Sequence, residues 1–289
     1  MAALPTTAVL GLGNMGAAVA ECLIGAGAPV IVWNRTAAKA AAFDGRCTVA
    51  SDARTAVQGS DVIVSVLPDY DTARAVLGDL RSDLSGRTVV QLSSGTPDEA
   101  RELSASLIAD GARYLDGKIF TYPARVGAPM TRFAYSGSAA AYEYWSPVGT
   151  ALGGRSTFLG DDPGAAAAVD LGWLSFLYGA SVGLFQAVAY ARAEGVDAAA
   201  VFDSVPSWLS ELDAESSYYD FLHGRADYSG DQATLEVHLA AMSHLAEAAR
   251  SRGISAALPD VLLQVFGRAI SLGHGSDELA AGIEALIHP

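Results

Sequence analysis

Hydrophobic runs without polar alternation recur through the first 160 residues of the chain. They are short and rich in β-branched residues, and they lie at residues 7–10, 29–33, 61–67 and 87–93. Such runs are typical of strands that are buried on both faces of a parallel sheet. Helices are expected at residues 71–80 and 97–109, and further strands at 114–120 and 133–137. This alternation indicates a doubly wound sheet, which we expect to end near residue 159.

From residue 161 onward the pattern becomes helical. Asp162 is a typical N-cap residue and Pro163 is favoured at the first helical position, so a helix is predicted to begin here. It continues without another proline to about Ala193 and ends at Gly195. At 1.5 Å per residue it would be roughly 45 Å long, which is more than a small domain needs. Because it is apolar on nearly all sides, we expect it to connect two domains and to be covered by a partner subunit.

The first apolar run leads directly into the sequence GLGNMG, which an Ala-rich helical segment follows. In a dinucleotide-binding unit the first glycine makes a tight turn, the second lets the backbone approach the pyrophosphate, and the third lets helix and strand pack closely. The phosphate lies at the helix N-terminus, where free N–H groups favour negative charge. The expected cofactor contacts here are Gly11, Leu12, Gly13, Asn14, Met15 and Gly16. The alternative is a glycine-rich turn that binds no nucleotide.

The residues after the second apolar run distinguish between the two nicotinamide coenzymes. NAD enzymes usually have an Asp or Glu there for the ribose 2′-OH, whereas an Arg accommodates the 2′-phosphate of NADP. This chain has Asn34, Arg35 and Thr36, with Lys39 on the next helix and no carboxylate nearby. These groups can bind the phosphate, and Arg35 can stack on the adenine, so the predicted cofactor is NADPH. If Arg35 is instead a solvated surface cation, the coenzyme preference is loose.

The carboxyl ends of the third and fourth apolar runs are expected to hold the nicotinamide half of the coenzyme. Ligands of doubly wound sheets lie beyond the carboxyl ends of the strands. This places residues 67–70 and 93–96 there, with Leu67 and Ser94 as the expected contacts. The alternative is that residues 69–70 simply begin a helix and that Ser94 belongs to a turn.

Together these features predict an α/β fold class with an N-terminal Rossmann-type doubly wound sheet, a long interdomain helix and an all-α C-terminal domain. The expected boundaries are residues 1–162 for the dinucleotide-binding domain, 163–194 for the helix and 195–289 for the C-terminal domain.

Composition narrows the classes of function. The 289 residues suffice for two domains, and 51% hydrophobic residues with a mean hydropathy of +0.27 supply a large core. A net charge of −14 and a pI near 4.6 argue against nucleic acid and anionic membranes as partners. Cys22 and Cys47 form neither a disulfide framework nor a metal-site spacing, so no metal is expected. We expect a cytoplasmic protein, because we find neither a signal peptide nor a stretch of membrane-spanning length.

One carboxylate interrupts the apolar run of the predicted long helix. Asp170 lies among small and apolar residues at 165–173. A buried carboxylate must be hydrogen-bonded or have a raised pKa. Its neighbours on the helix face are Trp173, Leu174 and Leu177, with Tyr178 close to that face. Asp170 is therefore a candidate catalytic residue, and the alternative is a structural Asp that is bonded to a neighbouring segment.

Several motifs make the chain similar to the imine reductases, a family within the broader β-hydroxyacid dehydrogenase group. The motifs are GLGNMG at 11–16, WNRTAAKA at 33–40, DYD at 69–71, LSSGTPDEAREL at 92–103, YLDGKI at 114–119, YSG at 135–137, FLGDDPG at 158–164 and HLAAMSHL at 238–245. In the hydroxyacid dehydrogenases a lysine on the interdomain helix handles the proton of the substrate oxygen. This helix has no lysine, and Asp170 stands where imine reductases have Asp or Tyr.

The resemblance implies NADPH-dependent reduction of imines or iminium ions, cyclic ones above all, to chiral amines by hydride transfer. An iminium already carries its proton and a positive charge, so Asp170 would orient the nitrogen, stabilise the cation or donate a proton. Tyr178 matches a catalytic tyrosine of members capable of reductive amination. Those members have Asn where this chain has Ser94, which implies weak reductive amination, and Asp170 implies R-selectivity.

The resemblance also implies a homodimer with its active site at the subunit interface, and a C-terminal domain like that of 6-phosphogluconate dehydrogenase. The expected substrate-pocket residues are Tyr122, Trp173, Leu174, Leu177, Trp208, His238 and Met242. Two alternatives stay open. One is a β-hydroxyacid dehydrogenase of unusual chemistry, which the absent lysine disfavours. The other is a non-catalytic NADP-binding sensor, which would not need Asp170.

Overall fold

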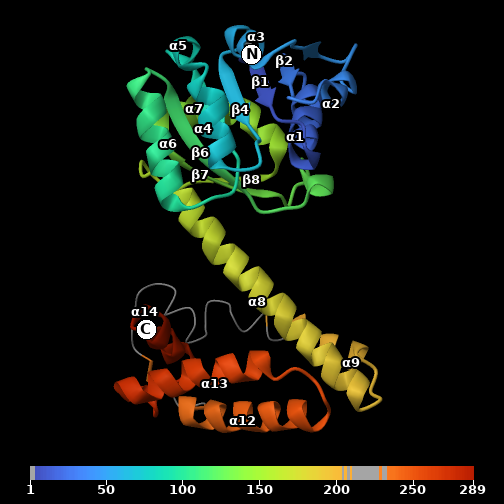
Figure 1. Cartoon of the computed structure of the whole chain (residues 1–289), viewed down its shortest axis with the longest axis vertical. Helices are drawn as coiled ribbons and strands as arrows, with labels where there is room; N and C mark the ends of the chain where they lie inside the picture. The colour runs from blue at the N-terminus through green and yellow to red at the C-terminus, as the bar shows by residue number, and fades with distance from the viewer. Residues whose placement is uncertain (1–3, 204, 207–208, 210–227, 230–232) are drawn as a thin grey trace. The chain divides into compact units, whose positions relative to one another are not determined.

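The computed structural model describes residues 4–203, 205–206, 209, 228–229 and 233–289 (Figure 1). The chain divides into two compact units, Met1–Ser175 and Phe176–Pro289. The first unit contains a sheet with its helices, and the second is helical in its described residues.

The first unit is built on one eight-stranded sheet with the strand order β3-β2-β1-β4-β5-β6-β7-β8. The strands are β1 (Thr7–Leu10), β2 (Val30–Trp33), β3 (Thr48–Val49), β4 (Val62–Ser65), β5 (Thr88–Gln91), β6 (Arg113–Ile119), β7 (Arg132–Gly137) and β8 (Arg155–Phe158). Neighbouring strands are parallel except for the antiparallel pair β6 and β7. The order changes direction beside β1, and a ligand crevice is expected at that point of such a sheet. The predicted α/β fold with a doubly wound sheet is confirmed.

Helices cover both faces of this sheet, so its central strands β1, β4 and β5 are buried along their whole length. On one face Val9 of β1 packs in a core with residues of α1 and α7, and on the other Ala8 and Leu10 pack with residues of α3, α4 and α6. The helices of this unit are α1 (Asn14–Gly25), α2 (Ala37–Ala41), α3 (Ala53–Gln58), α4 (Tyr70–Gly78), α5 (Arg81–Leu84), α6 (Pro97–Ala109) and α7 (Ala139–Gly149), with 3₁₀ turns η1 (Pro123–Arg125) and η2 (Thr150–Leu152).

The bounds of α6 are those predicted from the sequence, because strong capping residues define its start. The Thr96 hydroxyl accepts a hydrogen bond from the Glu99 N–H, and the Glu99 carboxylate accepts one from the Thr96 N–H at 2.7 Å. The sequence did not predict β3 or α7. With two residues β3 is too short to form an apolar run, and α7 contains Pro147.

The long helix α8 runs from Ala165 to Ala193, so it begins two residues after the predicted start at Pro163. The Asp162 carboxylate accepts a hydrogen bond from the Gly164 N–H at 3.0 Å and two from Arg101 of α6 at 2.9 and 2.8 Å. The buried Ser136 hydroxyl of β7 donates to the Pro163 carbonyl at 3.0 Å and accepts from the Ala166 N–H at 2.9 Å. The start of α8 is thus fixed to the sheet and to α6.

The second unit contains the C-terminal part of α8 and shorter helical segments. They are α9 (Ala199–Phe202), α12 (Leu235–Ser251), α13 (Ala257–Ala269), the π-helical turn η3 (Ile270–His274), the 3₁₀ turn η4 (Leu279–Ile283) and α14 (Glu284–Ile287). The Tyr190 hydroxyl of α8 donates to the Leu245 carbonyl of α12 at 2.6 Å, and Arg252 pairs with Glu194 at 2.5 Å. Among its described residues the β pairing is limited to an isolated bridge, as expected for the predicted all-α domain.

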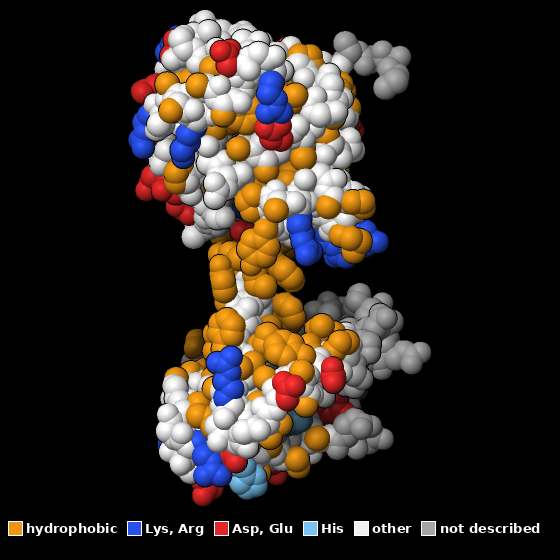
Figure 2. Space-filling model, turned by 90° about the vertical axis from the view of Figure 1, so that its right-hand side faces the viewer, with side chains coloured by type: hydrophobic (Ala, Val, Ile, Leu, Met, Phe, Trp, Pro, Cys, Tyr) orange, Lys and Arg blue, Asp and Glu red, His pale blue; other side chains and the backbone are white. Residues whose placement is uncertain are grey.

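The helix α8 is long and apolar enough to cross a membrane by length and composition, with a window of mean hydropathy 1.4. The expectation that no stretch reaches membrane-spanning length is therefore wrong on this criterion. Asp170 and the scattered Gly and Ser residues interrupt the apolar pattern without lowering its mean enough. Core helices of soluble proteins pass the same test. The side chains of Tyr178, Val182 and Phe185 are 64%, 47% and 67% exposed, and Figure 2 shows hydrophobic side chains gathered along the middle of α8.

The substitution Ser136→Ala is expected to lower the free energy of unfolding by about 1–3 kcal/mol, because a buried N–H group and carbonyl at the start of α8 lose their partner. Urea-induced unfolding followed by circular dichroism measures this. Ser146→Ala is the control, since that hydroxyl donates only to the Glu143 carbonyl at an exposed place, and it should change the stability by less than about 0.5 kcal/mol. Equal effects of the two substitutions would contradict the anchoring role of Ser136.

Candidate functional site

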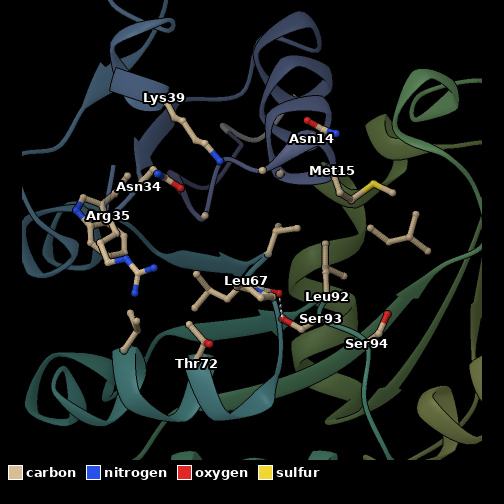
Figure 3. Close-up of a pocket in the computed structure, with 18 of the residues that line it drawn as sticks. Asn14, Met15, Asn34, Arg35, Lys39, Leu67, Thr72, Leu92, Ser93 and Ser94 are labelled. Atoms are coloured by element: carbon tan, nitrogen blue, oxygen red, sulfur yellow. Dashed lines mark hydrogen bonds between the residues drawn. The ribbon is translucent and has the colours of Figure 1, made fainter. Parts of the chain in front are cut away.

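A cavity of about 510 Å³ lies at the carboxyl edge of the sheet, where the loops after β1, β2, β4 and β5 meet the start of α8 (Figure 3). Its lining residues are Gly11, Gly13, Asn14, Met15, Gly16, Trp33, Asn34, Arg35, Thr36, Lys39, Val66, Leu67, Pro68, Thr72, Val76, Leu92, Ser93, Ser94, Lys118, Ile119 and Asp170. All of them belong to the first unit. Every predicted cofactor contact except Leu12 lines this cavity, which lies where the strand order predicts a ligand.

The glycine loop has the shape that a pyrophosphate needs. Gly11 has a φ of +98°, in the left-handed region that favours glycine. A Cβ atom at Gly16 would lie 1.9 Å from the Gly11 carbonyl oxygen, so only glycine lets α1 begin this close to β1. A Cβ atom at Gly13 would meet no heavy atom within 4 Å, so a ligand can approach the backbone there. The first turn of α1 has no side-chain cap, which leaves its N–H groups for an anion.

Leu12 does not contact the cavity through its side chain, which is buried in the core. Its backbone N–H donates to the Asn34 amide oxygen at 2.9 Å, and the Asn34 amide nitrogen donates to the Thr36 carbonyl at 3.1 Å. Asn34 therefore joins the glycine loop to the end of β2. It was predicted as a ligand contact, and in the structure its amide also has this supporting role.

One end of the cavity is basic. Arg35 and Lys39 are exposed and lie at the same end, near Asn34 (Figure 3). Among the described lining residues, Asp170 is the only acidic one. Two cations without a carboxylate are suited to binding a phosphate group. This end has no acidic residue that could accept a hydrogen bond from a ribose 2′-OH.

The other end of the cavity is formed by the loops after β4 and β5, together with Met15 (Figure 3). Leu67 and Ser94 line it as predicted, and the Ser93 hydroxyl donates to the Leu67 carbonyl at 2.7 Å, which joins the two loops. Asp69 does not line the cavity, because its carboxylate accepts the Thr72 N–H at 2.7 Å and caps α4. Residues 67, 68, 93 and 94 of the two predicted segments line the cavity, whereas Asp69 begins a helix, as in the alternative interpretation.

Asp170 projects from the start of α8 with only 6% of its surface exposed. Within the described part of the chain its carboxylate has no hydrogen-bond donor, so the alternative of a structural, internally bonded Asp finds no support there. Burial raises the pKa of the Asp170 carboxyl above its ordinary value. The ammonium group of Lys118 opposes this rise, and the carboxylate of Asp116 adds to it. A buried carboxylate that faces a cavity without a partner is suited to binding a cation.

Lys118 also lines the cavity, although the sequence analysis gave it no role. Its side chain is 2% exposed and pairs with the buried Asp116 carboxylate at 2.7 Å. Both residues belong to the motif YLDGKI, which we quoted only for its family resemblance. Two charged residues at alternate positions of an otherwise apolar strand lie on one face of a sheet, so this spacing could have identified the pair.

None of the other predicted site residues that the structure describes lines this cavity. Trp173 lines a second cavity of about 600 Å³ in the first unit, and its ring lies edge-on to that of Phe120 at 6.4 Å. Tyr122 is 72% exposed. The others are Leu174 near the end of the first unit, Leu177, Tyr178, His238 and Met242 in the second unit, and Trp208, which lies outside the described residues.

Comparisons with known proteins extend over both units. The family model of the NAD binding domain of 6-phosphogluconate dehydrogenase matches residues 6–160, and that of the NADPH-dependent reductive aminase-like C-terminal domain matches residues 162–288. An NADPH-dependent reductive aminase from Aspergillus oryzae is 30% identical over 282 residues, which cover 96% of this chain and 95% of that protein.

Two solved structures are similar over nearly the whole chain. The imine reductase from Myxococcus stipitatus in complex with NADP⁺ has a TM-score of 0.89 and 34% identity, covering 98% of this chain and 100% of that one. The reductive aminase from Aspergillus terreus in complex with NADPH and ethyl levulinate has a TM-score of 0.87 and 32% identity, covering 99% and 100%.

The substitution Arg35→Ala is expected to weaken the binding of NADPH by about 10- to 100-fold and that of NADH only slightly, because a charge-assisted hydrogen bond contributes about 1.5–3 kcal/mol. Titration followed by coenzyme fluorescence measures both affinities. Arg46→Ala is the matched control, since Arg46 is an exposed arginine that pairs with Glu21 and does not line the cavity. Equal losses for the two coenzymes would mean that Arg35 does not bind the 2′-phosphate.

Proposed function

The chain belongs to the family of NADPH-dependent imine reductases and reductive aminases, and on this premise we propose that Asp170 binds and stabilises the iminium ion that the enzyme reduces. The protein is an oxidoreductase that reduces imines with NADPH as its coenzyme. The predicted family, enzyme class and coenzyme are confirmed. The role of Asp170 is supported by one observation above all, its buried carboxylate that faces the coenzyme cavity without a donor in the described part of the chain.

The residues of the cavity fit NADPH along its whole length. Gly13 leaves room for the pyrophosphate at the start of α1, and Arg35 and Lys39 would hold the 2′-phosphate. Leu67 and Ser94 would contact the nicotinamide half. When bound, NADPH supplies a hydride from its nicotinamide C4 for transfer to the carbon of the C=N bond.

Asp170 acts on the nitrogen of that bond. Its carboxylate accepts a hydrogen bond from the iminium N–H and orients the C=N group, and the attraction is stronger in a buried site than in water. The carboxylate form is required for this role. Since burial raises the pKa of Asp170, the rate falls as the pH drops through that raised value. Proton donation to a neutral imine would require the opposite protonation state of Asp170.

A homodimer would complete the substrate pocket. Tyr178, His238 and Met242 belong to the second unit, whereas the coenzyme cavity belongs entirely to the first. We infer that the second unit of one subunit covers the cavity of its partner and contributes these side chains. The exposed apolar residues of α8, such as Phe185, favour such a partner.

A second subunit explains the apolar surface of α8 better than a membrane does. The start of the helix is fixed by Ser136, and its end by Tyr190 and Glu194, each within a folded unit. We therefore place the enzyme in the cytoplasm, with residues 1–162 as the coenzyme domain, 163–194 as the interdomain helix and 195–289 as the dimerisation and substrate domain.

The substrate class is proposed from the pocket chemistry. Aromatic and apolar candidates, namely Tyr122, Trp173, Leu174 and Leu177, favour cyclic imines of some bulk. Ser94 in place of Asn gives one hydroxyl where reductive aminases have an amide, so we expect weak coupling of ketone and amine. R-selectivity follows from Asp170 only through the family resemblance and stays a prediction.

The substitution Asp170→Asn is expected to lower kcat/KM for a cyclic imine such as 2-methylpyrroline by about 100-fold, because it removes the charge that stabilises the cation. NADPH oxidation followed at 340 nm measures the rate, and NADPH affinity should stay unchanged. Asp161→Asn is the matched control, since Asp161 is an exposed carboxylate near the start of α8 that does not line the cavity.

The same assay separates the alternatives. Oxidation of 3-hydroxyisobutyrate without imine turnover would favour a hydroxyacid dehydrogenase. Tight NADPH binding without any turnover would favour a sensor. Full imine turnover by Asp170→Asn would contradict the role of Asp170.

The substitution Phe185→Asp is expected to convert the dimer to a monomer and to abolish imine turnover, because it places a charge on the apolar surface of α8. Sedimentation velocity gives the mass, and NADPH binding to the first unit should persist. Ile108→Asp is the control, since Ile108 is 54% exposed on α6 of the first unit, and it should leave the dimer intact. A wild-type protein that is monomeric at micromolar concentration and still active would exclude the proposed interface.

A further inference from the structure

Lys118 occupies a point where the ends of three strands meet at the cavity. Its Nζ donates hydrogen bonds to the Ser93 carbonyl after β5 at 2.7 Å and to the Tyr70 hydroxyl after β4 at 2.8 Å. It also pairs with the Asp116 carboxylate of its own strand β6 at 2.7 Å. Gly117 between them faces the other side, where a Cβ atom would lie 2.6 Å from the Leu92 side chain. The strand therefore delivers both charged groups to one face.

The ammonium group acts through its charge and not as a proton donor to the substrate. Its ammonium group donates hydrogen bonds to the Ser93 carbonyl and the Tyr70 hydroxyl, and the Asp116 carboxylate pairs with its charge at 2.7 Å. Breaking any of these contacts to protonate a substrate would leave a buried acceptor without its partner. The pair with Asp116 is also neutral as a whole, so Lys118 does not repel a cationic substrate from the cavity.

Among the described residues, two charged groups act electrostatically on Asp170, and both belong to the strand whose Lys118 lines the same cavity. They are Lys118 and Asp116 of β6, and α8 itself contributes no second charged residue near Asp170. Asp116 accepts hydrogen bonds from the hydroxyls of Tyr70 and Tyr114 in addition to its ion pair, so two hydroxyl donors and one ammonium group stabilise its charge. Of the two influences on Asp170, the attraction of Lys118 is the larger.

We propose that Lys118 is a positioning residue for imine reduction, because its fixed ammonium group keeps Asp170 in the carboxylate form that binds the iminium ion. This inference rests on the proposed function of Asp170. Without Lys118 the carboxylate of Asp170 would face only desolvation and the like charge of Asp116, and both raise its pKa. Asp170 would then become protonated, and lose its attraction for the cation, at a higher pH.

The substitution Lys118→Met tests this through the pH profile of kcat/KM. The acidic limb of this profile is expected to shift to higher pH by about one unit relative to wild type. The limb reports the ionisation of Asp170 in the free enzyme. Lys39→Met is the matched control, because it removes a lysine from the other end of the same cavity. It should weaken NADPH binding and leave the position of the limb unchanged.

A second variant covers the case in which Lys118→Met does not fold because Asp116 is left unpaired. The double variant Asp116→Asn with Lys118→Met removes the pair as a unit and buries no unpaired charge. Its limb is still expected to move upward, by less than in the single variant, because the attraction of Lys118 exceeds the repulsion of Asp116. Circular dichroism and NADPH binding show which variants are folded.

The outcomes distinguish this inference from the function on which it rests. If the acidic limb of the folded variants lies at the same pH as in wild type, even with a lowered kcat, Lys118 is a purely structural residue and the inference is overturned. If wild type reduces imines and Asp170→Asn does not, such a result leaves the function of Asp170 intact. Absence of imine turnover in wild type, or full turnover by Asp170→Asn, would instead remove the proposed function itself.

Discussion

The arrangement of the site depends on the desolvation of one carboxylate, that of Asp170. Asp170 is nearly buried and has no donor within the described part of the chain, and removing an ionised carboxylate from water costs several kcal/mol. Such a group persists only where the surrounding structure is rigid and supplies an opposite charge. The structure provides both. Ser136 and the Asp162–Arg101 pair fix the start of α8, and Lys118 places an ammonium group at the same cavity.

The strand register of the sheet explains how Lys118 and the residue that fixes the start of α8 are held on neighbouring strands. Ser65, Gln91, Asp116 and Ser136 are paired neighbours on successive strands from β4 to β7, and all four are buried. They form a polar row that crosses four neighbouring strands on one face of the sheet. Asp116 in this row holds Lys118, and Ser136 holds the N-terminus of α8. The row therefore connects the ammonium group of the site to the helix that carries its carboxylate.

The sequence predicted those parts of this arrangement that depend on local patterns. The apolar runs, the glycine loop and the capping residues of α6 each have a local physical cause, and the structure has them at the expected places. Asp170 could be recognised because a charge interrupts an apolar helix. The role of Lys118 could not be read in this way, since its partners Tyr70 and Ser93 are 48 and 25 residues away in the chain. The motif also does not show that the side chain of Leu12 lies in the core and not at the cavity.

The position of the lysine bears on which reaction the site can support. A hydroxyacid dehydrogenase needs an ammonium group that exchanges a proton with the substrate oxygen, and α8 has no lysine to do so. Lys118 brings an ammonium group to the same cavity from β6, but it donates hydrogen bonds to Tyr70 and Ser93 and pairs with the Asp116 carboxylate. An alkoxide developing in this cavity would be repelled by Asp170, and the charge of Lys118 is already balanced by Asp116. A cation would find an unpaired carboxylate. The same two charged residues thus favour a C=N substrate over a C=O substrate by both attraction and exclusion.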